Sequence, residues 1–134
     1  MTGGEAGPVH GYWRMRPRAP APGAPVAHLD EIPERTGREF TFGRGKSAFS
    51  MFVIRRDRSV WGYLNLCPHF SLPLNYRAGE FLNEDGSRIR CSMHFAEFDI
   101  ETGRCLSGAA EGCWLDPVPL DVADDGAVSI RLAA

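Results

Sequence analysis

The sequence lacks the features that would assign it to a membrane-bound or nucleic-acid-binding class. No apolar run approaches the roughly 18 residues that a membrane-spanning helix needs. The first ten residues contain no basic segment followed by an apolar stretch, so no secretory signal is expected. A formal net charge of only −2 at pH 7 argues against a nucleic-acid or anionic-membrane partner. We therefore expect a cytoplasmic chain of 134 residues with one folded domain.

The sequence also lacks helical periodicity, because no stretch repeats apolar residues every three to four positions over about ten residues. Short β-forming runs bounded by turn residues predict strands at 38–42, 49–54, 60–66, 88–91, 95–100, 104–106, 119–122 and 127–132. Adjacent runs joined by turns predict three antiparallel hairpins, over 49–66, 95–106 and 119–132. The expected fold class is all-β.

The N-terminal part of the chain has a different composition. Residues 1–25 hold five of the ten prolines, and proline cannot donate the backbone hydrogen bonds of helices or sheets. We expect an arm over 1–25 and a folded domain over 26–134. Arg14, Arg16 and Arg18 make this arm locally basic. A solubilising tail and a packing or partner-docking segment both remain open.

The four cysteines divide into two kinds. Cys67 and Cys91 each have a histidine within three residues, whereas Cys105 and Cys113 have none. Disulfides are not expected, because they rarely persist in a reducing cytosol. Cys105 falls in a predicted strand and is expected to be a small buried hydrophobic residue, and Cys113 to be a free thiol. The first pair therefore indicates ligands and the second pair indicates packing.

The most informative feature is a repeated pairing of cysteine with histidine. Cys67-Pro68-His69 and Cys91-Ser92-Met93-His94 each offer one thiolate and one imidazole, and each follows a predicted strand. A tetrahedral Cys₂His₂ zinc site is one interpretation. Structural zinc sites usually group like ligands, whereas here both segments are mixed in the same order. This order favours a binuclear centre held between two loops, although a zinc site and unligated structural residues remain alternatives.

The two motifs resemble the signature of Rieske [2Fe–2S] proteins, C-x-H followed later by C-x-x-H. The similarity includes the stretches Asn65–Leu74 and Ile89–Gly108, and the recognisable part runs from about 26 to 132. The resemblance implies a Rieske-type fold of small antiparallel sheets with two cluster-binding loops at one tip. It also implies a [2Fe–2S] cofactor. Residues 70–90 form a longer spacer than is usual in the family, and we expect the extra length at 81–86 to be a surface turn.

The resemblance assigns a role to each predicted ligand. Cys67 and Cys91 would bind the inner iron, and His69 and His94 the outer iron nearer the surface. Two neutral imidazoles in place of thiolates raise the reduction potential above that of an all-cysteine ferredoxin. Their outer ring nitrogens can also lose protons in the oxidised state.

Four positions around these ligands predict a low-potential member of the family. High-potential members carry two further cysteines where this chain has Leu72 and Met93. They also carry a serine and a tyrosine that donate hydrogen bonds to the cluster sulfurs, where this chain has Ala96 and Phe98. Without those donors the more negative reduced cluster is less stable.

The resemblance implies an electron-transfer function. His10 and His28 are the only histidines outside the motifs, so a second, mononuclear iron site for oxygen activation is not expected. We expect a ferredoxin component that passes single electrons from a flavin-dependent ferredoxin reductase to a terminal oxygenase, with no catalysis by the chain alone. A small accessory subunit of a larger reductase, of the nitrite reductase type, and a redox-sensing regulatory protein are the alternatives.

Overall fold

The computed structural model describes residues 12–45, 48–66, 81–83, 86–90, 96–107 and 114–132. Within these ranges the chain forms β-strands and two short 3₁₀ helices, η1 (Tyr12–Met15) and η2 (Leu29–Glu31). The strands are β1 (Pro25–His28), β2 (Gly37–Phe42), β3 (Phe49–Arg56), β4 (Ser59–Leu64), β5 (Arg88–Arg90), β6 (Glu97–Asp99), β7 (Cys105–Ser107), β8 (Pro117–Val118), β9 (Leu120–Val122) and β10 (Ala127–Ile130). None of the helices in these ranges is long and apolar enough to cross a membrane.

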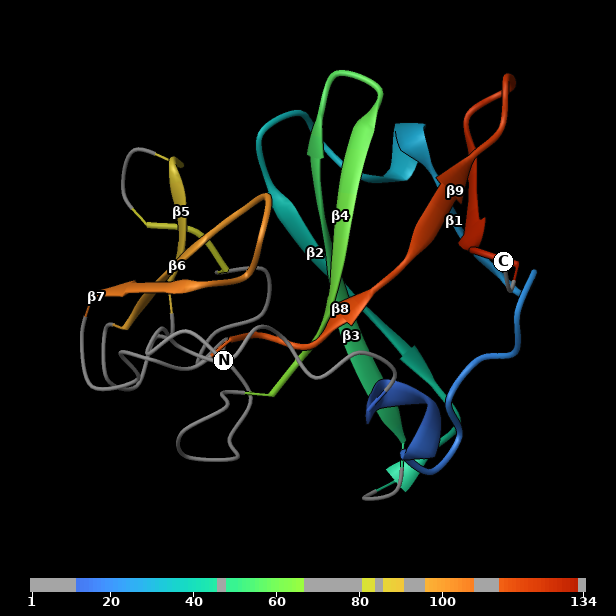
Figure 1. The fold of residues 1–134 in the computed structure, drawn as a ribbon. Coiled ribbons are helices and arrows are strands. Elements are labelled where there is room, and N and C mark those ends of the chain that lie inside the picture. The colour runs from blue at the N-terminus through green and yellow to red at the C-terminus, as the bar shows by residue number, and fades with distance from the viewer. Residues whose placement is uncertain are drawn as a thin grey trace, which may run out of the picture.

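The strands form three antiparallel sheets, with the orders β1-β10-β9, β2-β3-β4-β8 and β5-β6-β7. Figure 1 shows the β2-β3-β4-β8 sheet in the middle, with the other two sheets on either side of it. The all-β prediction is confirmed, and the three predicted hairpins correspond to β3–β4, β6–β7 and β9–β10. Strand β1, whose pairing with β10 joins the two ends of the domain, has no counterpart among the predicted strands.

The last predicted hairpin is preceded by a separate strand. Pro117–Val118 forms β8 and pairs with β4, whereas Leu120–Val122 forms β9 and pairs with β10. Pro119 lies between them, and its missing N–H interrupts the ladder at that point. The chain therefore passes from the middle sheet to the outer sheet at Pro119.

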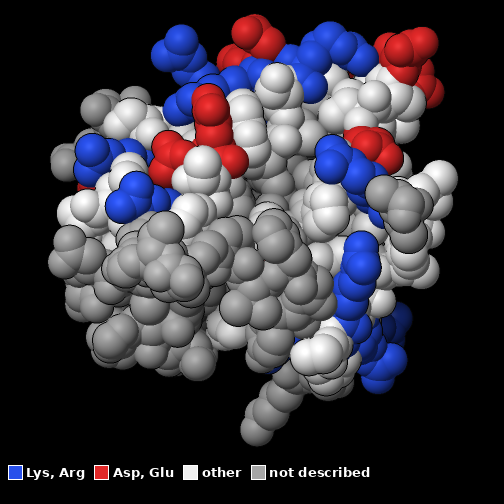
Figure 2. All heavy atoms as spheres, in the orientation of Figure 1, with Lys and Arg blue, Asp and Glu red and all other residues white. Residues whose placement is uncertain are grey.

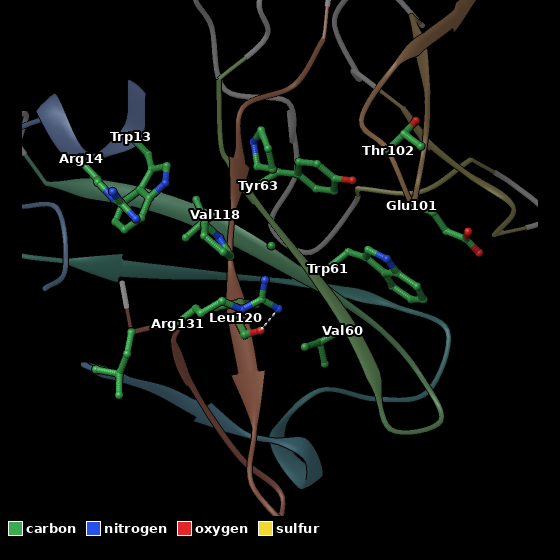
Figure 3. A pocket seen from close by; sticks show the side chains of 14 residues that line it. Trp13, Arg14, Val60, Trp61, Tyr63, Glu101, Thr102, Val118, Leu120 and Arg131 are labelled. Carbon is green, nitrogen blue, oxygen red and sulfur yellow. Dashed lines mark hydrogen bonds between the residues drawn. The ribbon is translucent and has the colours of Figure 1, made fainter. Parts of the chain in front are cut away.

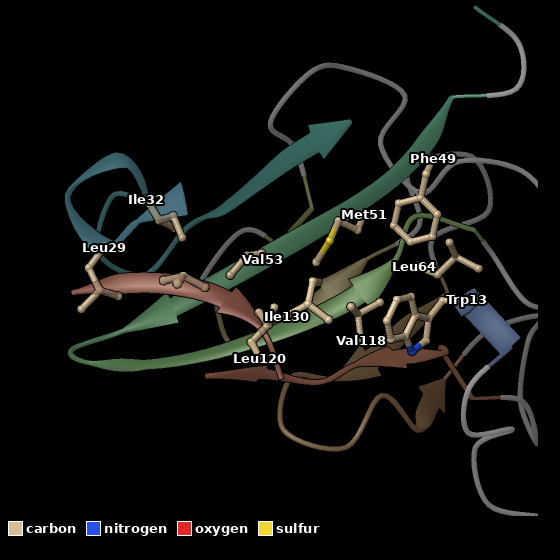
Figure 4. Packing of buried hydrophobic residues seen from close by; sticks show 11 residues of the cluster. Trp13, Leu29, Ile32, Phe49, Met51, Val53, Leu64, Val118, Leu120 and Ile130 are labelled. Carbon is tan, nitrogen blue, oxygen red and sulfur yellow. The ribbon is translucent and has the colours of Figure 1, made fainter. Parts of the chain in front are cut away.

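Strand β3 supplies both hydrophobic cores because alternate side chains point to opposite faces of a sheet. Phe52 and Ile54 belong to a core shared with the β5-β6-β7 sheet, called core 1 here. Phe49, Met51 and Val53 belong to core 2, which Figure 4 shows between the middle sheet and the β1-β10-β9 sheet. A strand buried on both faces has a continuous apolar sequence, which explains why the run 49–54 shows no polar alternation beyond Ser50.

Trp13 connects the N-terminal segment to core 2. Its side chain is only 1% exposed, and its ring lies edge-on to Phe49 with centroids 6.3 Å apart. Its backbone N–H donates to the Asp116 carboxylate at 2.8 Å. The division of the chain at residue 25 stays a prediction, but this tryptophan of the proposed arm is part of the packed core.

The expected surface turn at 81–86 is wrong for its first residues. Phe81 is fully buried in core 1, where its ring stacks on Phe52 with centroids 4.5 Å apart. Leu82 forms a bridge with Ile89, so the second residue of the expected turn is paired with β5. The Asn83 side-chain oxygen accepts from the backbone N–H groups of Ser87 and Arg88, which closes this turn. Burial of the large aromatic side chain of Phe81 stabilises its packed position in core 1, although the residues that follow it have turn character.

Candidate metal centre

The four predicted ligands, Cys67, His69, Cys91 and His94, lie outside the described residues. The structure instead shows the framework at the ends of the two segments that contain them. Leu66 precedes the first segment and Phe81 follows it, while Arg90 precedes the second and Ala96 follows it. The positions of these four described residues determine where each segment leaves and rejoins the fold.

A buried polar network holds the chain just before the first motif. Asn65 is 6% exposed, and its backbone N–H donates to the Ser50 carbonyl oxygen at 3.0 Å. Its side-chain amide donates to Ser50 Oγ at 3.1 Å, and Ser50 Oγ donates to the Glu39 carboxylate at 2.6 Å. Each donor in this network has an acceptor, as burial of polar groups requires. The network attaches the end of β4 to both β2 and β3.

Sequence reasoning does not single out this network. The only available signal is a polar asparagine at the end of an apolar strand, two positions before Cys67. Glu39 and Ser50 carry no such signal, because they reach Asn65 only through the pairing of β2 with β3 and of β3 with β4. The tertiary structure is needed to bring these three side chains together.

The end of the first segment and the start of the second lie side by side. The Arg90 backbone N–H donates to the Phe81 carbonyl oxygen at 2.8 Å. Arg90 also pairs with Glu97, the residue after Ala96, in the β5–β6 ladder. Three of the four junctions are therefore held in one small region of hydrogen-bonded backbone. The end of the first motif segment therefore lies beside both ends of the second.

Core 1 lies beneath these junctions. Phe81, Ala96 and Phe98 are fully buried in it, together with Cys105 at 4% exposure. The prediction that Cys105 packs as a small hydrophobic residue is confirmed, and its Sγ lies 3.4 Å from the Ser107 carbonyl oxygen. Cys113 lies outside the described residues.

Tyr63 is a titratable group buried in core 1, and its surroundings shift its pKa. Its hydroxyl donates to the Ile100 carbonyl oxygen at 2.6 Å, which ties β4 to the turn after β6. Burial, with smaller contributions from the charges of Asp99 and Glu101, raises the pKa of Tyr63 above its ordinary value. Tyr63 therefore stays neutral at every pH at which the protein is expected to work.

Of the two histidines outside the motifs, His10 is not among the described residues and His28 has a structural role. The His28 side chain accepts from the Asp30 backbone N–H at 3.2 Å and so caps η2. Its Nε2 lies 2.6 Å from the Asp125 carbonyl oxygen, in the turn between β9 and β10. His28 thus connects two surface turns, and both of its ring nitrogens already have partners.

The donor set fits a [2Fe–2S] cluster with mixed ligation. Two thiolates and two imidazoles are the ligands that a Rieske centre requires, with histidines in place of two cysteines on one iron. Within the described ranges, no group of three or more histidine, cysteine or carboxylate side chains is placed to hold a metal ion. The two motif segments supply the two cysteines and two histidines of such a centre, and the hydrogen-bonded junctions around Phe81, Arg90 and Ala96 are compatible with their joint use.

A hollow of about 620 Å³ lies along β4 and β8. Figure 3 shows Trp13 and Arg14 at one side of it and Trp61 with Glu101 at the other. The Arg131 guanidinium donates to the Leu120 carbonyl oxygen at 3.0 Å and so closes part of its wall. Nothing in its described lining indicates a metal site.

A comparison with protein-family models matches residues 23–122 to the Rieske [2Fe-2S] domain. The chain belongs to the Rieske [2Fe–2S] family. The match covers most of the 134 residues, so both the family resemblance and the [2Fe–2S] cofactor inferred from the paired motifs are confirmed. The assignment of Cys67, His69, Cys91 and His94 as the ligands stays a prediction.

Solved structures of Rieske proteins share the fold. The ferredoxin of carbazole 1,9a-dioxygenase from Nocardioides aromaticivorans IC177 is 19% identical with a TM-score of 0.64, over 84% of this chain and 100% of that one. The Sphingomonas yanoikuyae B1 ferredoxin is 22% identical with a TM-score of 0.61, over 83% of this chain and 99% of that one. The terminal oxygenase of carbazole 1,9a-dioxygenase from Novosphingobium sp. KA1 is 14% identical with a TM-score of 0.63, over 92% of this chain and 33% of that one. No curated protein sequence matches the chain.

Proposed function

We propose that this Rieske protein is a ferredoxin-type carrier that accepts single electrons from a flavin-dependent ferredoxin reductase and passes them to a terminal oxygenase. The observation that carries the proposal is the likeness to two ferredoxins over essentially their whole length. A structure in which such a ferredoxin is bound to its oxygenase also shares the fold and supports this choice of partner. We propose no catalysis by the chain alone, and a cytoplasmic location stays a prediction.

The predicted ligands suit a carrier. A [2Fe–2S] cluster supplies a one-electron couple when it is bound. Cys67 and Cys91 would hold one iron by anionic thiolates, and His69 and His94 would hold the other by neutral imidazoles. A non-ligating imidazole nitrogen can hold or release a proton, so these histidines would couple proton binding to the oxidation state.

We further propose a low reduction potential, toward the negative end of the roughly −150 to +300 mV range of Rieske centres. Ala96 and Phe98, which occupy the positions of the hydrogen-bonding serine and tyrosine of high-potential members, have no side-chain donor. Both are fully buried in core 1. A low potential suits a protein that must reduce an oxygenase.

The ligand assignment is tested by electron paramagnetic resonance of the dithionite-reduced protein, with iron, sulfide and zinc assayed on the same sample. We expect a rhombic signal with an average g below 2 and two irons per chain, as a mixed-ligand [2Fe–2S] centre requires. His69→Cys and His94→Cys should each abolish that signal. An unchanged spectrum in both variants would overturn the assignment, and one zinc without a signal would overturn the electron-transfer proposal.

Matched controls come from the residues outside the motifs. His28→Cys makes the same change at a histidine that caps η2, and Cys105→Ala removes a cysteine that packs in core 1. Both variants should keep the rhombic signal. Reduction of the wild-type protein by NADH and a flavin-dependent ferredoxin reductase, followed by reoxidation on addition of a terminal oxygenase, then tests the direction of electron flow.

A further inference from the structure

Four arginines gather at one end of the molecule. Arg14, Arg16 and Arg18 lie on η1 and the turn after it, and Arg44 lies in the turn between β2 and β3. Arg14, Arg18 and Arg44 are exposed and Arg16 is half-buried. The two turns are in contact, because a Cβ placed on Gly43 would collide with Cδ of Arg18. We call this group the arginine surface.

The backbone that carries the arginine surface is held in place. Trp13 is buried in core 2, and its carbonyl oxygen accepts from the Arg16 N–H at 3.2 Å. The Arg16 carbonyl oxygen in turn accepts from the Ala19 N–H at 3.3 Å. Arg18 has a φ of 63°, a left-handed conformation that an arginine adopts only at some cost. The backbone that carries Arg14, Arg16 and Arg18 is therefore ordered before a partner binds, and binding would mainly order the arginine side chains.

The four charges have no acidic partner within the part of the chain that the structure describes. No ion pair joins any of them to a carboxylate of the described residues, whereas Arg55, Arg88 and Arg131 each pair with one. In Figure 2 the blue side chains over η1 have no coloured acidic side chain beside them, while red and blue are mixed at the opposite end. The net charge of the chain is −2, so this positive surface is local.

The arginine surface lies at the end of the middle sheet from which the first motif departs. The β2–β3 ladder ends at the Phe42–Phe49 pair, directly before the turn that holds Arg44. The Asn65 N–H donates to the Ser50 carbonyl oxygen, so β4 ends at this same edge. Leu66 is the next residue, and Cys67 follows it in the chain.

We propose that the arginine surface docks a carboxylate-rich surface of the redox partner protein that exchanges electrons with this chain. The inference rests on the proposed carrier function and names the chemistry of its partner. Arginine suits this role because its planar guanidinium binds a carboxylate through two parallel hydrogen bonds. Exposed charges of this kind mainly raise the association rate and are screened by salt, which favours the fast, reversible docking that a carrier needs.

A gold electrode coated with a carboxylate-terminated alkanethiol monolayer provides a defined acidic surface for the test. Voltammetry of the cluster-containing wild-type protein should show electron exchange that is fast at about 10 mM salt and slower at about 200 mM, because the Debye length falls from about 30 Å to under 10 Å. Arg18→Glu and Arg44→Glu should each lower the exchange rate at low salt by about three- to tenfold.

Arg35→Glu is the matched control. Arg35 is exposed, has a φ of 61° close to that of Arg18, and lies at the opposite end of β3, where its N–H donates to the Arg55 carbonyl oxygen. The substitution makes the same charge change with the same backbone strain. It should leave the rate on the carboxylate monolayer within twofold of wild type. Circular dichroism and the visible absorption of the cluster verify that each variant is folded and loaded.

The outcomes separate the two proposals. Equal rates in wild type, Arg18→Glu and Arg44→Glu, or an equal loss in Arg35→Glu, would overturn the docking inference while leaving the carrier function intact. Salt-resistant binding of wild type, but not Arg18→Glu, to phosphatidylglycerol vesicles or duplex DNA would also overturn it in favour of another partner class. Absence of a reversible one-electron wave for wild type with a small-molecule mediator on a hydroxyl-terminated monolayer would overturn the carrier function itself.

Discussion

Tyr63 illustrates how one residue joins two sheets through a single polar atom. Its ring packs in core 1 beside Phe52, with centroids 5.8 Å apart, while its hydroxyl reaches the Ile100 carbonyl oxygen. Without the tyrosine hydroxyl, this carbonyl would lose a partner inside the protein, and such a loss costs more than the hydrogen bond itself contributes. The sequence places Tyr63 in an apolar strand but contains no sign of its acceptor, which lies beyond both motif segments.

We predict that Tyr63→Phe lowers the unfolding free energy by about 1–2 kcal/mol at pH 7. The pKa of Tyr63 is higher in the folded state than in the unfolded state, where it has its ordinary value of about 10. The stabilisation by Tyr63 is therefore complete below pH 10 and decreases as the pH rises above it. The difference between wild type and Tyr63→Phe should therefore shrink between about pH 10 and pH 11.5. Urea unfolding across this range measures it, and a constant difference would contradict the prediction.

The β6–β7 hairpin shows how one element depends on the packing around its turn. Gly103 follows the turn with a φ of 79°, and its N–H donates to the Asp99 carbonyl oxygen at 2.8 Å. A Cβ at this position would lie 2.8 Å from Cε1 of Tyr63 and 3.3 Å from Cβ of Leu115. Both the left-handed backbone and the close neighbours therefore require glycine.

We predict that Gly103→Ala costs about 2–4 kcal/mol of unfolding free energy, from backbone strain together with overpacking. Gly86→Ala is the matched control, since Gly86 has a φ of 76° and a Cβ there would meet nothing within 4 Å. It should cost only the strain, about 1 kcal/mol. Chemical denaturation of both variants makes the comparison. An equal cost at the two positions would show that the contacts with Tyr63 and Leu115 do not matter.

Across the whole molecule, residues from both ends of the chain complete core 2. Trp13 precedes the first strand, while Val128 and Ile130 belong to the last. Strand β1 pairs with β10, and the Gly23 N–H donates to the Ile130 carbonyl oxygen at 2.9 Å. The described part of the proposed arm therefore helps to cover the core formed by the rest of the domain.

We predict that Trp13→Ala lowers the unfolding free energy by about 3–5 kcal/mol, the range for truncating a large buried aromatic side chain. Met15→Ala changes a neighbouring residue of η1 that is 77% exposed, and it should change stability by less than about 0.5 kcal/mol. The midpoints of urea unfolding, measured on cluster-loaded protein, test both. A small effect of Trp13→Ala would support an N-terminal arm independent of the domain.

Most of the strands, the three hairpins and the family follow from the amino-acid sequence alone, whereas β1 and β8 do not. Strands such as Phe49–Arg56 and the turns between neighbouring runs are local properties, set by β-forming residues and by glycine and aspartate at short range. The paired Cys-x-His and Cys-x-x-His motifs are equally local, and they are enough to indicate the cofactor. Local pattern is sufficient because each of these features is formed by residues close together in the chain.

Which distant segments meet depends on tertiary packing instead. The pairing of β1 with β10, the burial of Trp13 and Phe81, and the Glu39–Ser50–Asn65 network all join residues that lie far apart in sequence. The same holds for the arginine surface, where the turn that carries Arg44 packs against Arg18 through Gly43. Burial and long-range strand pairing depend on how side chains of different sheets pack against one another. A short stretch of sequence does not contain that information, because the packing partners lie elsewhere in the chain.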